Sequence, residues 1–183
     1  MDTNLVARAQ DGDEEAFESL ALAIGNRLHA VAHRILRDID LAEDATQQAL
    51  LSIWRDLPSL RDPSRFEAWA FRLLVRVCYA EGRRARTWSP NLHLLQTEGQ
   101  LEADAASVVI NRDELERGFR RLSIDHRAVV VLHHYLGMPL DRVADTLDIP
   151  RGTARSRLHY AMRAMRAALE ADARPAERRA TAR

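Results

Sequence analysis

The 183-residue chain contains no lysine and a single cysteine, and it is poor in glycine, proline and aromatic residues. The lone thiol of Cys78 excludes an intrachain disulfide and is compatible with a reducing compartment. Seven glycines, six prolines and 5% aromatic residues, without sustained alternation of Val or Ile with polar residues, disfavour a β fold. The composition therefore predicts an all-α protein, and 46% hydrophobic residues are enough to build its core.

Long apolar runs are also missing. No stretch approaches the roughly 18 consecutive apolar residues that indicate a membrane-spanning helix. The first 17 residues are acidic and lack the apolar segment of a signal peptide, so we expect a cytoplasmic protein. There is no Gly-rich phosphate loop, no Cys-x-x-Cys pair and no nucleophile motif. The sequence therefore indicates neither an enzyme nor a cofactor.

Charge is segregated along the chain, although the 27 arginines and 27 acidic residues cancel. Residues 1–60 carry a net charge of −6 and residues 91–149 carry −4, whereas 61–90 and 150–183 carry +4 and +6. The two basic blocks suggest two contacts with a polyanion, and the acidic blocks suit basic partners. The competing explanation is chance clustering together with a basic tail, and a GC-rich genome accounts for the use of arginine alone.

Apolar spacing predicts two small helical domains joined by a linker. The first, residues 1–86, is a helical bundle whose first helix breaks near Gly12 and whose third ends at Pro58. Its last helix is expected to turn a stripe inward that consists of Phe66, Trp69, Leu73 and Val77. Residues 87–110 show weak periodicity and are expected to be the linker, and residues 171–183 a disordered basic tail.

The second domain, residues 111–170, is predicted to hold four helices, of which the last two form a helix-turn-helix. Gly137 suits the end of its second helix, and a short helix over 140–147 is followed by a turn at 148–150. The long basic helix that follows is expected to pack through a seam made of Ala154, Leu158, Ala161 and Met165.

The start of this basic helix, DIPRGTARSRLHYAM over residues 148–162, places arginines, hydroxyls and small residues on its outer side. Arginine can reach guanine edges or phosphates, and the free N–H groups at a helix start can hold a phosphate. A solvated arginine-rich helix is the competing interpretation. The short helix and tight turn before it favour DNA binding.

Two segments resemble a known family. Residues 140–165, LDRVADTLDIPRGTARSRLHYAMRAM, resemble the C-terminal DNA-binding unit of bacterial sigma factors. Residues 42–86, AEDATQQALLSIWRDLPSLRDPSRFEAWAFRLLVRVCYAEGRRAR, resemble their core-binding and −10-binding unit. The two units in this order, with only a short linker, resemble the extracytoplasmic-function (ECF) group over roughly residues 4–170.

The resemblance implies a non-enzymatic protein that binds core RNA polymerase and directs transcription initiation at promoters. Promoter DNA is then the second partner, and an anti-sigma factor is a further candidate. The segment matching residues 41–57 would dock on a coiled coil of the largest polymerase subunit through Glu43, Asp44, Gln47, Gln48, Leu51 and Trp54. Gln48 stands where the family often has Glu, and the competing interpretation places Trp54 in the core of the bundle.

The resemblance also assigns two DNA-binding sets. The −10 set, suited to a melted strand with a flipped base, is Arg72, Arg76, Tyr79, Arg83 and Arg84. Arg76 and Ala80 stand where many relatives have Asn and Asp, which leaves the −10 preference open. For the −35 duplex, the residues expected at base edges are Arg155, Ser156 and His159, and those at phosphates are Arg151, Thr153 and Arg157. Tyr160 stands where relatives often carry Arg.

Parts of the sequence are also compatible with other functions. A stand-alone helix-turn-helix regulator would use residues 1–86 for sensing or dimerisation and would bind duplex DNA without polymerase. A purely protein-binding module is disfavoured by the basic helix. His29 and His33, and the adjacent His133 and His134, lack the further ligands of a metal site, so none is predicted.

Overall fold

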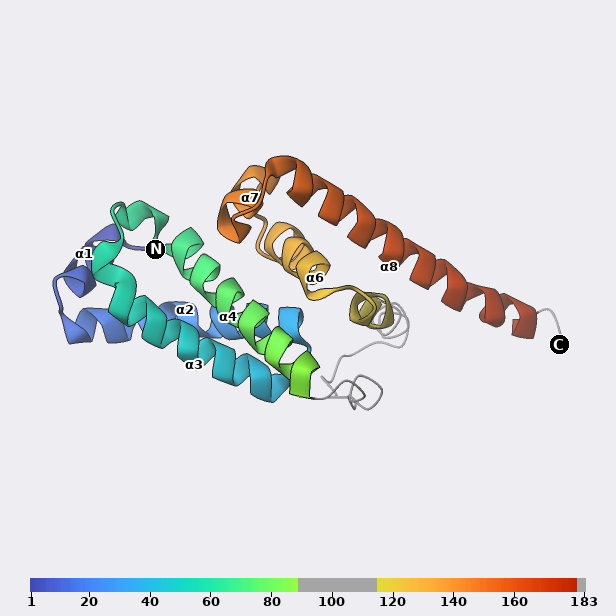
Figure 1. Ribbon diagram of the computed structural model, residues 1–183, viewed down its shortest axis with the longest axis horizontal. Helices are drawn as coiled ribbons and strands as arrows, with labels where there is room; N and C mark the ends of the chain where they lie inside the picture. The colour runs from blue at the N-terminus through green and yellow to red at the C-terminus, as the bar shows by residue number, and fades with distance from the viewer. Residues whose placement is uncertain (89–114, 181–183) are drawn as a thin grey trace.

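The computed structural model describes the backbone of residues 1–88 and 115–180, and every regular element in these ranges is helical. We call residues 1–88 the first half and residues 115–180 the second half. Figure 1 shows α4 lying between the other helices of the first half and the helices of the second half. The predicted all-α fold is confirmed over these residues.

The first two helices, α1 (Thr3–Gln10) and α2 (Glu14–Leu36), are separated by Gly12. Gly12 has φ +90°, a conformation that costs glycine little, so the expected break occurs there. Asp13 caps α2 by accepting a hydrogen bond from the Ala16 N–H at 3.0 Å. This hydrogen bond and the Arg8 guanidinium hold the pKa of the Asp13 carboxyl below its usual value.

The next two long helices are α3 (Ile39–Asp56) and α4 (Phe66–Trp88), joined by the short helical turns η1 (Leu57–Ser59) and η2 (Pro63–Arg65). As expected, α3 ends just before Pro58. Its last residue is Asp56, and the proline ring cannot continue an α-helix.

The inner face of α4 differs from the predicted stripe. Phe66 is buried, but Trp69, Leu73 and Val77 are only partly buried. The fully packed residues are instead those about 100° further around the helix: Ala70, Phe71, Leu74, Val75 and Cys78. The reason is that α4 is packed from two sides, by α2 and α3 and by α6 and α7, so its apolar face is wider than a single stripe.

The second half contains a helical stretch at 115–120, then α6 (Ile124–Val130), a π-helical segment η4 (Val131–Tyr135), α7 (Leu140–Leu147) and α8 (Arg151–Ala180). The Ser123 side chain caps α6, and Gly137 with φ +67° follows η4. Asp148, with φ 56°, ends α7 and begins the turn into α8. This α7–turn–α8 unit is the predicted helix-turn-helix.

The ends of the predicted domains are placed differently. The backbone is helical through Ala180, whereas residues 171–183 are predicted to be a disordered basic tail. Alanine, arginine and glutamate dominate this stretch, and all three favour helix. Residues 87 and 88 continue α4, while the rest of the predicted linker and residues 181–183 lie outside the described residues.

The two halves pack directly against each other. Helices α2 and α4 of the first half contact α6, η4 and α7 of the second. Buried residues of the second half join the same hydrophobic cluster as the core of the first half: Ala128, Val129, Val131, Leu132, Val143 and Leu147. A smaller cluster of Leu122, Val130 and Ala161 holds α6 to α8. The two helical units are therefore present, and they share one core.

Candidate nucleic-acid interface

The outward face of α8 begins one residue after Pro150, at the start of the second helix of the helix-turn-helix. The predicted seam holds, because Ala154 and Ala161 are buried and Leu158 and Met165 are partly buried. Ser156 and His159 lie on the opposite side with Arg155 flanking them, and all three are exposed, as is Arg151 in the first turn of the helix. Thr153 is half-buried beside them, and the His159 ring meets the exposed Tyr160 ring edge-on at 5.8 Å.

Arg157 does not share this face. It lies about 60° from the inner seam of α8, and only 26% of its side chain is exposed. Its guanidinium faces the carboxylate of Asp125 in α6 at 3.5 Å. Arg151, in contrast, is 72% exposed and lies 3.4 Å from Asp141 of α7. The structure therefore leaves Arg151, Arg155, Ser156 and His159 exposed on the first turns of α8 and sets Arg157 between α6 and α8.

The predicted −10 residues lie along α4. At 100° per residue, Arg72, Arg76, Tyr79 and Arg83 fall within about 60° of one another, and Arg84 lies beside this strip. Arg76, Arg83 and Arg84 are exposed. Arg84 also pairs with Glu81 one turn earlier, with an N–O distance of 2.9 Å. Three exposed guanidiniums on one helix are a suitable surface for a nucleic-acid backbone.

The other two residues of this set are covered by the second half. The Arg72 guanidinium donates a hydrogen bond to the backbone carbonyl of Asp145 in α7. The Tyr79 hydroxyl is buried, and burial, together with the nearby Asp125 carboxylate, raises the pKa of its phenol. In this arrangement the Arg72 guanidinium is engaged by α7, and the Tyr79 side chain is partly buried against the second half.

A third surface lies on α3. All six residues predicted to face polymerase are exposed: Glu43, Asp44, Gln47, Gln48, Leu51 and Trp54. Their opposite side is buried through Ala42, Ala45, Ala49 and Ile53. Leu51 has 69% of its surface exposed and Trp54 has 38%, so the interpretation that placed Trp54 in the core is wrong. Large apolar side chains next to acids and amides form a surface suited to a protein partner.

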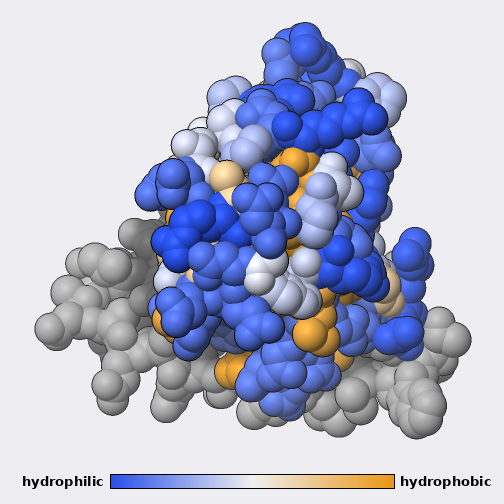
Figure 2. All heavy atoms as spheres, turned by 90° about the vertical axis from the view of Figure 1, so that its left-hand side faces the viewer, coloured by the Kyte–Doolittle hydropathy of each residue, from blue (hydrophilic) through white to orange (hydrophobic). Residues whose placement is uncertain are grey.

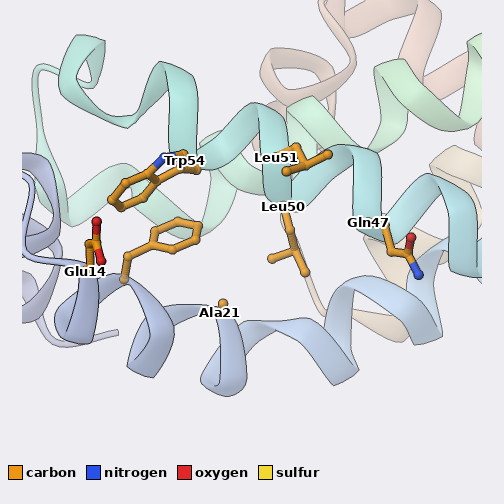
Figure 3. A pocket seen from close by; sticks show the side chains of 7 residues that line it. Glu14, Ala21, Gln47, Leu50, Leu51 and Trp54 are labelled. Carbon is orange, nitrogen blue, oxygen red and sulfur yellow. The ribbon is translucent and has the colours of Figure 1, made fainter.

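A groove of about 560 Å³ runs beside this surface, between α2 and α3. Figure 3 shows Trp54 and Leu50 reaching from α3 toward α2, with Ala21 on the facing wall and Glu14 and Gln47 near the two ends. Phe17 of α2 packs against the Trp54 ring with centroids 4.6 Å apart. Trp54 is thus fixed on one side and open on the other.

Sequence reasoning missed the α2 wall of this groove. Glu14, Phe17 and Ala21 lie on a helix about thirty residues earlier in the chain, and their spacing matches an ordinary amphipathic helix. No pattern in the sequence marks them as neighbours of Trp54.

Figure 2 shows that the end of the molecule seen there is mostly hydrophilic, with small separate apolar patches.

Neither a metal site nor a membrane span is found in the described part of the chain. These residues hold no group of three or more His, Cys, Asp or Glu side chains placed to bind a metal ion. His29 and His33 stack with ring centroids 6.5 Å apart, and the Nδ1 of His133 lies 2.7 Å from the Met138 carbonyl. No helix among the described residues is long and apolar enough to cross a membrane.

The chain matches two protein families along these same elements. Sigma-70 region 2 matches residues 20–88, which include α3 and α4, and Sigma-70 region 4 matches residues 118–167, which include the helix-turn-helix. The first match includes the surfaces described on α3 and α4, and the second includes the exposed start of α8.

Curated relatives share most of this length. The chain is 32% identical over 142 residues to the ECF RNA polymerase sigma factor SigL of Mycobacterium tuberculosis, covering 76% of this chain and 80% of SigL. It is 28% identical over 178 residues to the ECF RNA polymerase sigma-E factor of Escherichia coli, covering 90% and 92%. Among solved structures, CnrH in complex with the cytosolic domain of CnrY matches with a TM-score of 0.67 and 25% identity, covering 93% of this chain and 98% of that one.

Proposed function

The chain belongs to the extracytoplasmic-function sigma factors, and from this premise we propose how it divides its contacts between polymerase and promoter. As a sigma factor it binds core RNA polymerase and directs transcription initiation at promoters. This relationship favours the sigma function over a stand-alone helix-turn-helix regulator.

The α3 surface is our candidate for polymerase binding. The observation that carries this proposal is that Leu51 and Trp54 are exposed beside acidic and amide side chains on a helix whose other side is fully packed. The core of the bundle does not require these two apolar side chains, because it is built from the opposite face of α3. Exposed apolar side chains of this kind are typical of a binding surface. An apolar anchor surrounded by acids is complementary to a basic helical partner.

The exposed face of α8 is our candidate for the −35 duplex. A helix of this size fits the major groove, and the first turns of the second helix of a helix-turn-helix carry its base contacts. Arg155, Ser156 and His159 would meet base edges, while Arg151 and Thr153 would meet phosphates. Arg157 is a weaker candidate than its sequence position suggested, because it is engaged by Asp125.

The arginine-bearing face of α4 is our candidate for the melted −10 strand. Arg76, Arg83 and Arg84 would attract its phosphates, and Tyr79 would stack on a base once its ring is uncovered. Arg72 would join them under the same condition.

Three further proposals concern catalysis, cellular location and an additional partner. We propose that the protein is not an enzyme, because all three candidate surfaces act by contact, and that it works in the cytoplasm, where RNA polymerase acts. We also propose an anti-sigma factor as a candidate third partner, because CnrH was solved in complex with the cytosolic domain of a second protein, CnrY.

The experiment that tests this function compares DNA binding with and without core polymerase. Genomic fragments are incubated with the purified protein, with core polymerase, or with both, and the retained DNA is sequenced. We expect a shared sequence pattern to be enriched only when both proteins are present. Equal enrichment by the free protein would contradict the proposal and favour the stand-alone regulator.

A further inference from the structure

Tyr160 is a large aromatic side chain that α8 leaves open to solvent. Its surface is 58% exposed, compared with 38% for Trp54 on the polymerase surface. Helix α8 packs against α6 and α7, and Figure 1 shows α8 at the outer edge of the second half. A single exposed ring says little by itself, so its surroundings decide what it can contact.

Tyr160 belongs to one flank of α8, together with Thr153, Ser156 and Arg157. At about 100° per residue these four residues fall within about 100° of one another around the helix. Tyr160 lies two turns after Thr153, about 20° from it, and one turn after Ser156, about 40° from it. Since Ser156 is expected at a base edge, a duplex that Ser156 contacts comes within reach of the Tyr160 ring.

The polar groups on this flank are largely engaged within the protein. The Ser156 hydroxyl donates a hydrogen bond to the backbone carbonyl of Thr153, with an O–O distance of 3.0 Å. Thr153 is half-buried, and the Arg157 guanidinium faces the Asp125 carboxylate of α6 at 3.5 Å. Among these four residues of α8, Tyr160 is therefore the one that exposes a large apolar group.

The neighbouring His159 restricts where the Tyr160 ring can lie. The two rings meet edge-on, with centroids 5.8 Å apart and planes inclined at 71°. Such an edge-to-face pair is favourable, so the tyrosine loses little further conformational freedom when it contacts a ligand. His159 is itself exposed and expected at a base edge. The pair therefore presents a fixed aromatic ring beside a side chain that reads a base.

We propose that Tyr160 is a further specificity-determining residue of the −35 contact, and that its ring recognises the C5-methyl group of a thymine. This methyl is the apolar group that thymine presents in the major groove, and apolar side chains contact it there. Tyr160 follows Ser156 by four residues, about 6 Å along the helix axis, which is close to the rise of two base pairs. The thymine should therefore lie about two base pairs from the base that Ser156 contacts. The inference rests on the proposed function for the placement of α8 in a −35 duplex.

The experiment removes this methyl group and leaves the base pair intact. Uracil pairs with adenine as thymine does and lacks only the C5 methyl. Each thymine in the −35 half of a promoter fragment retained by the two proteins together is replaced in turn by uracil. Binding of each duplex to the holoenzyme, assembled from core polymerase and this protein, is measured by competition with the labelled parent fragment. We expect one uracil to weaken binding by the wild type about fourfold, the factor that one buried methyl group provides.

Substitutions then identify the side chain that contacts the methyl. Tyr160→Ala should bind the thymine and uracil duplexes equally, because the ring is gone. Tyr160→Phe should keep the fourfold preference, because it retains the ring and loses only the hydroxyl. Tyr135→Ala is the matched control and should also keep the preference, since Tyr135 is 47% exposed but lies on η4.

The outcomes separate this inference from the proposed function. Equal binding of every uracil duplex and its parent by the wild type would overturn the inference. A uracil effect of the same size in Tyr160→Ala would overturn it as well, because another residue would then contact the methyl. If no fragment requires core polymerase for retention, the proposed function fails instead. The same comparison can then be made on duplexes retained by the free protein, because α8 is the DNA-binding helix in both cases.

Discussion

Substitution of Leu51 most clearly distinguishes an effect on polymerase binding from an effect on the stability of the fold. With 69% of its surface exposed, Leu51 buries only about a third of what a core leucine buries. Complete burial of a leucine contributes about 1.5–3 kcal/mol, so Leu51→Ala should lower the free energy of unfolding by less than about 1 kcal/mol. If Leu51 is an anchor of the polymerase interface, its removal should cost about 2 kcal/mol or more of binding free energy, which is about thirtyfold in Kd.

The assay is a titration of fluorescently labelled protein with core RNA polymerase, accompanied by urea unfolding of each variant. Leu22→Ala is the matched control, because Leu22 is 73% exposed on α2 and does not line the groove. We expect similar unfolding midpoints for both variants and weaker polymerase binding only for Leu51→Ala. Equal Kd values for Leu51→Ala, Leu22→Ala and the wild type would refute the assignment of this surface.

Three further predictions concern the DNA helix, the core and pH. Arg155→Ala should lose about 1–3 kcal/mol at one −35 base and relax the preference there, measured with single-base promoter variants; a uniform loss would make Arg155 a phosphate contact. Ile53→Ala, at a buried site, should lower the free energy of unfolding by about 2–5 kcal/mol in urea titrations, and a loss below about 1 kcal/mol would contradict the packing. Burial, aided by Arg37, lowers the pKa of His33 from 6.5, so the unfolded chain binds more protons and stability should fall as pH drops from about 7 to 5. Thermal unfolding of His33→Gln should show a smaller loss of stability over this pH range. A loss equal to that of the wild type would contradict the prediction.

Local features of the sequence determine much of the fold. Gly12, Pro58 and Gly137 mark helix boundaries through restrictions on the backbone that act within a few residues. The seam of α8 follows from helical periodicity, because this part of the helix is packed on one side only. The exposed residues of α3 follow for the same reason. Where a helix is buried on one face only, the spacing of its apolar residues is enough to predict which residues are exposed on the other face.

Contacts between distant segments could not be predicted in this way. The predicted buried face of α4 was wrong because two groups of helices pack on this helix. The spacing of apolar residues alone cannot tell which group buries which residues. Arg72 and Asp145 are 73 residues apart, and nothing in either segment specifies their hydrogen bond. Phe17 likewise gives no sign that it will support Trp54. The sequence therefore predicts which residues can meet DNA or polymerase, and tertiary packing decides which of them are accessible.

The most direct test of the central claim is transcription in vitro with purified core RNA polymerase on the fragments retained by the two proteins together. Our account predicts transcripts with defined start sites when both proteins are present, none from either alone, and a marked loss with Leu51→Ala but not with Leu22→Ala. No new transcript in the presence of both proteins, together with tight binding of the same duplex by the free protein, would contradict the account.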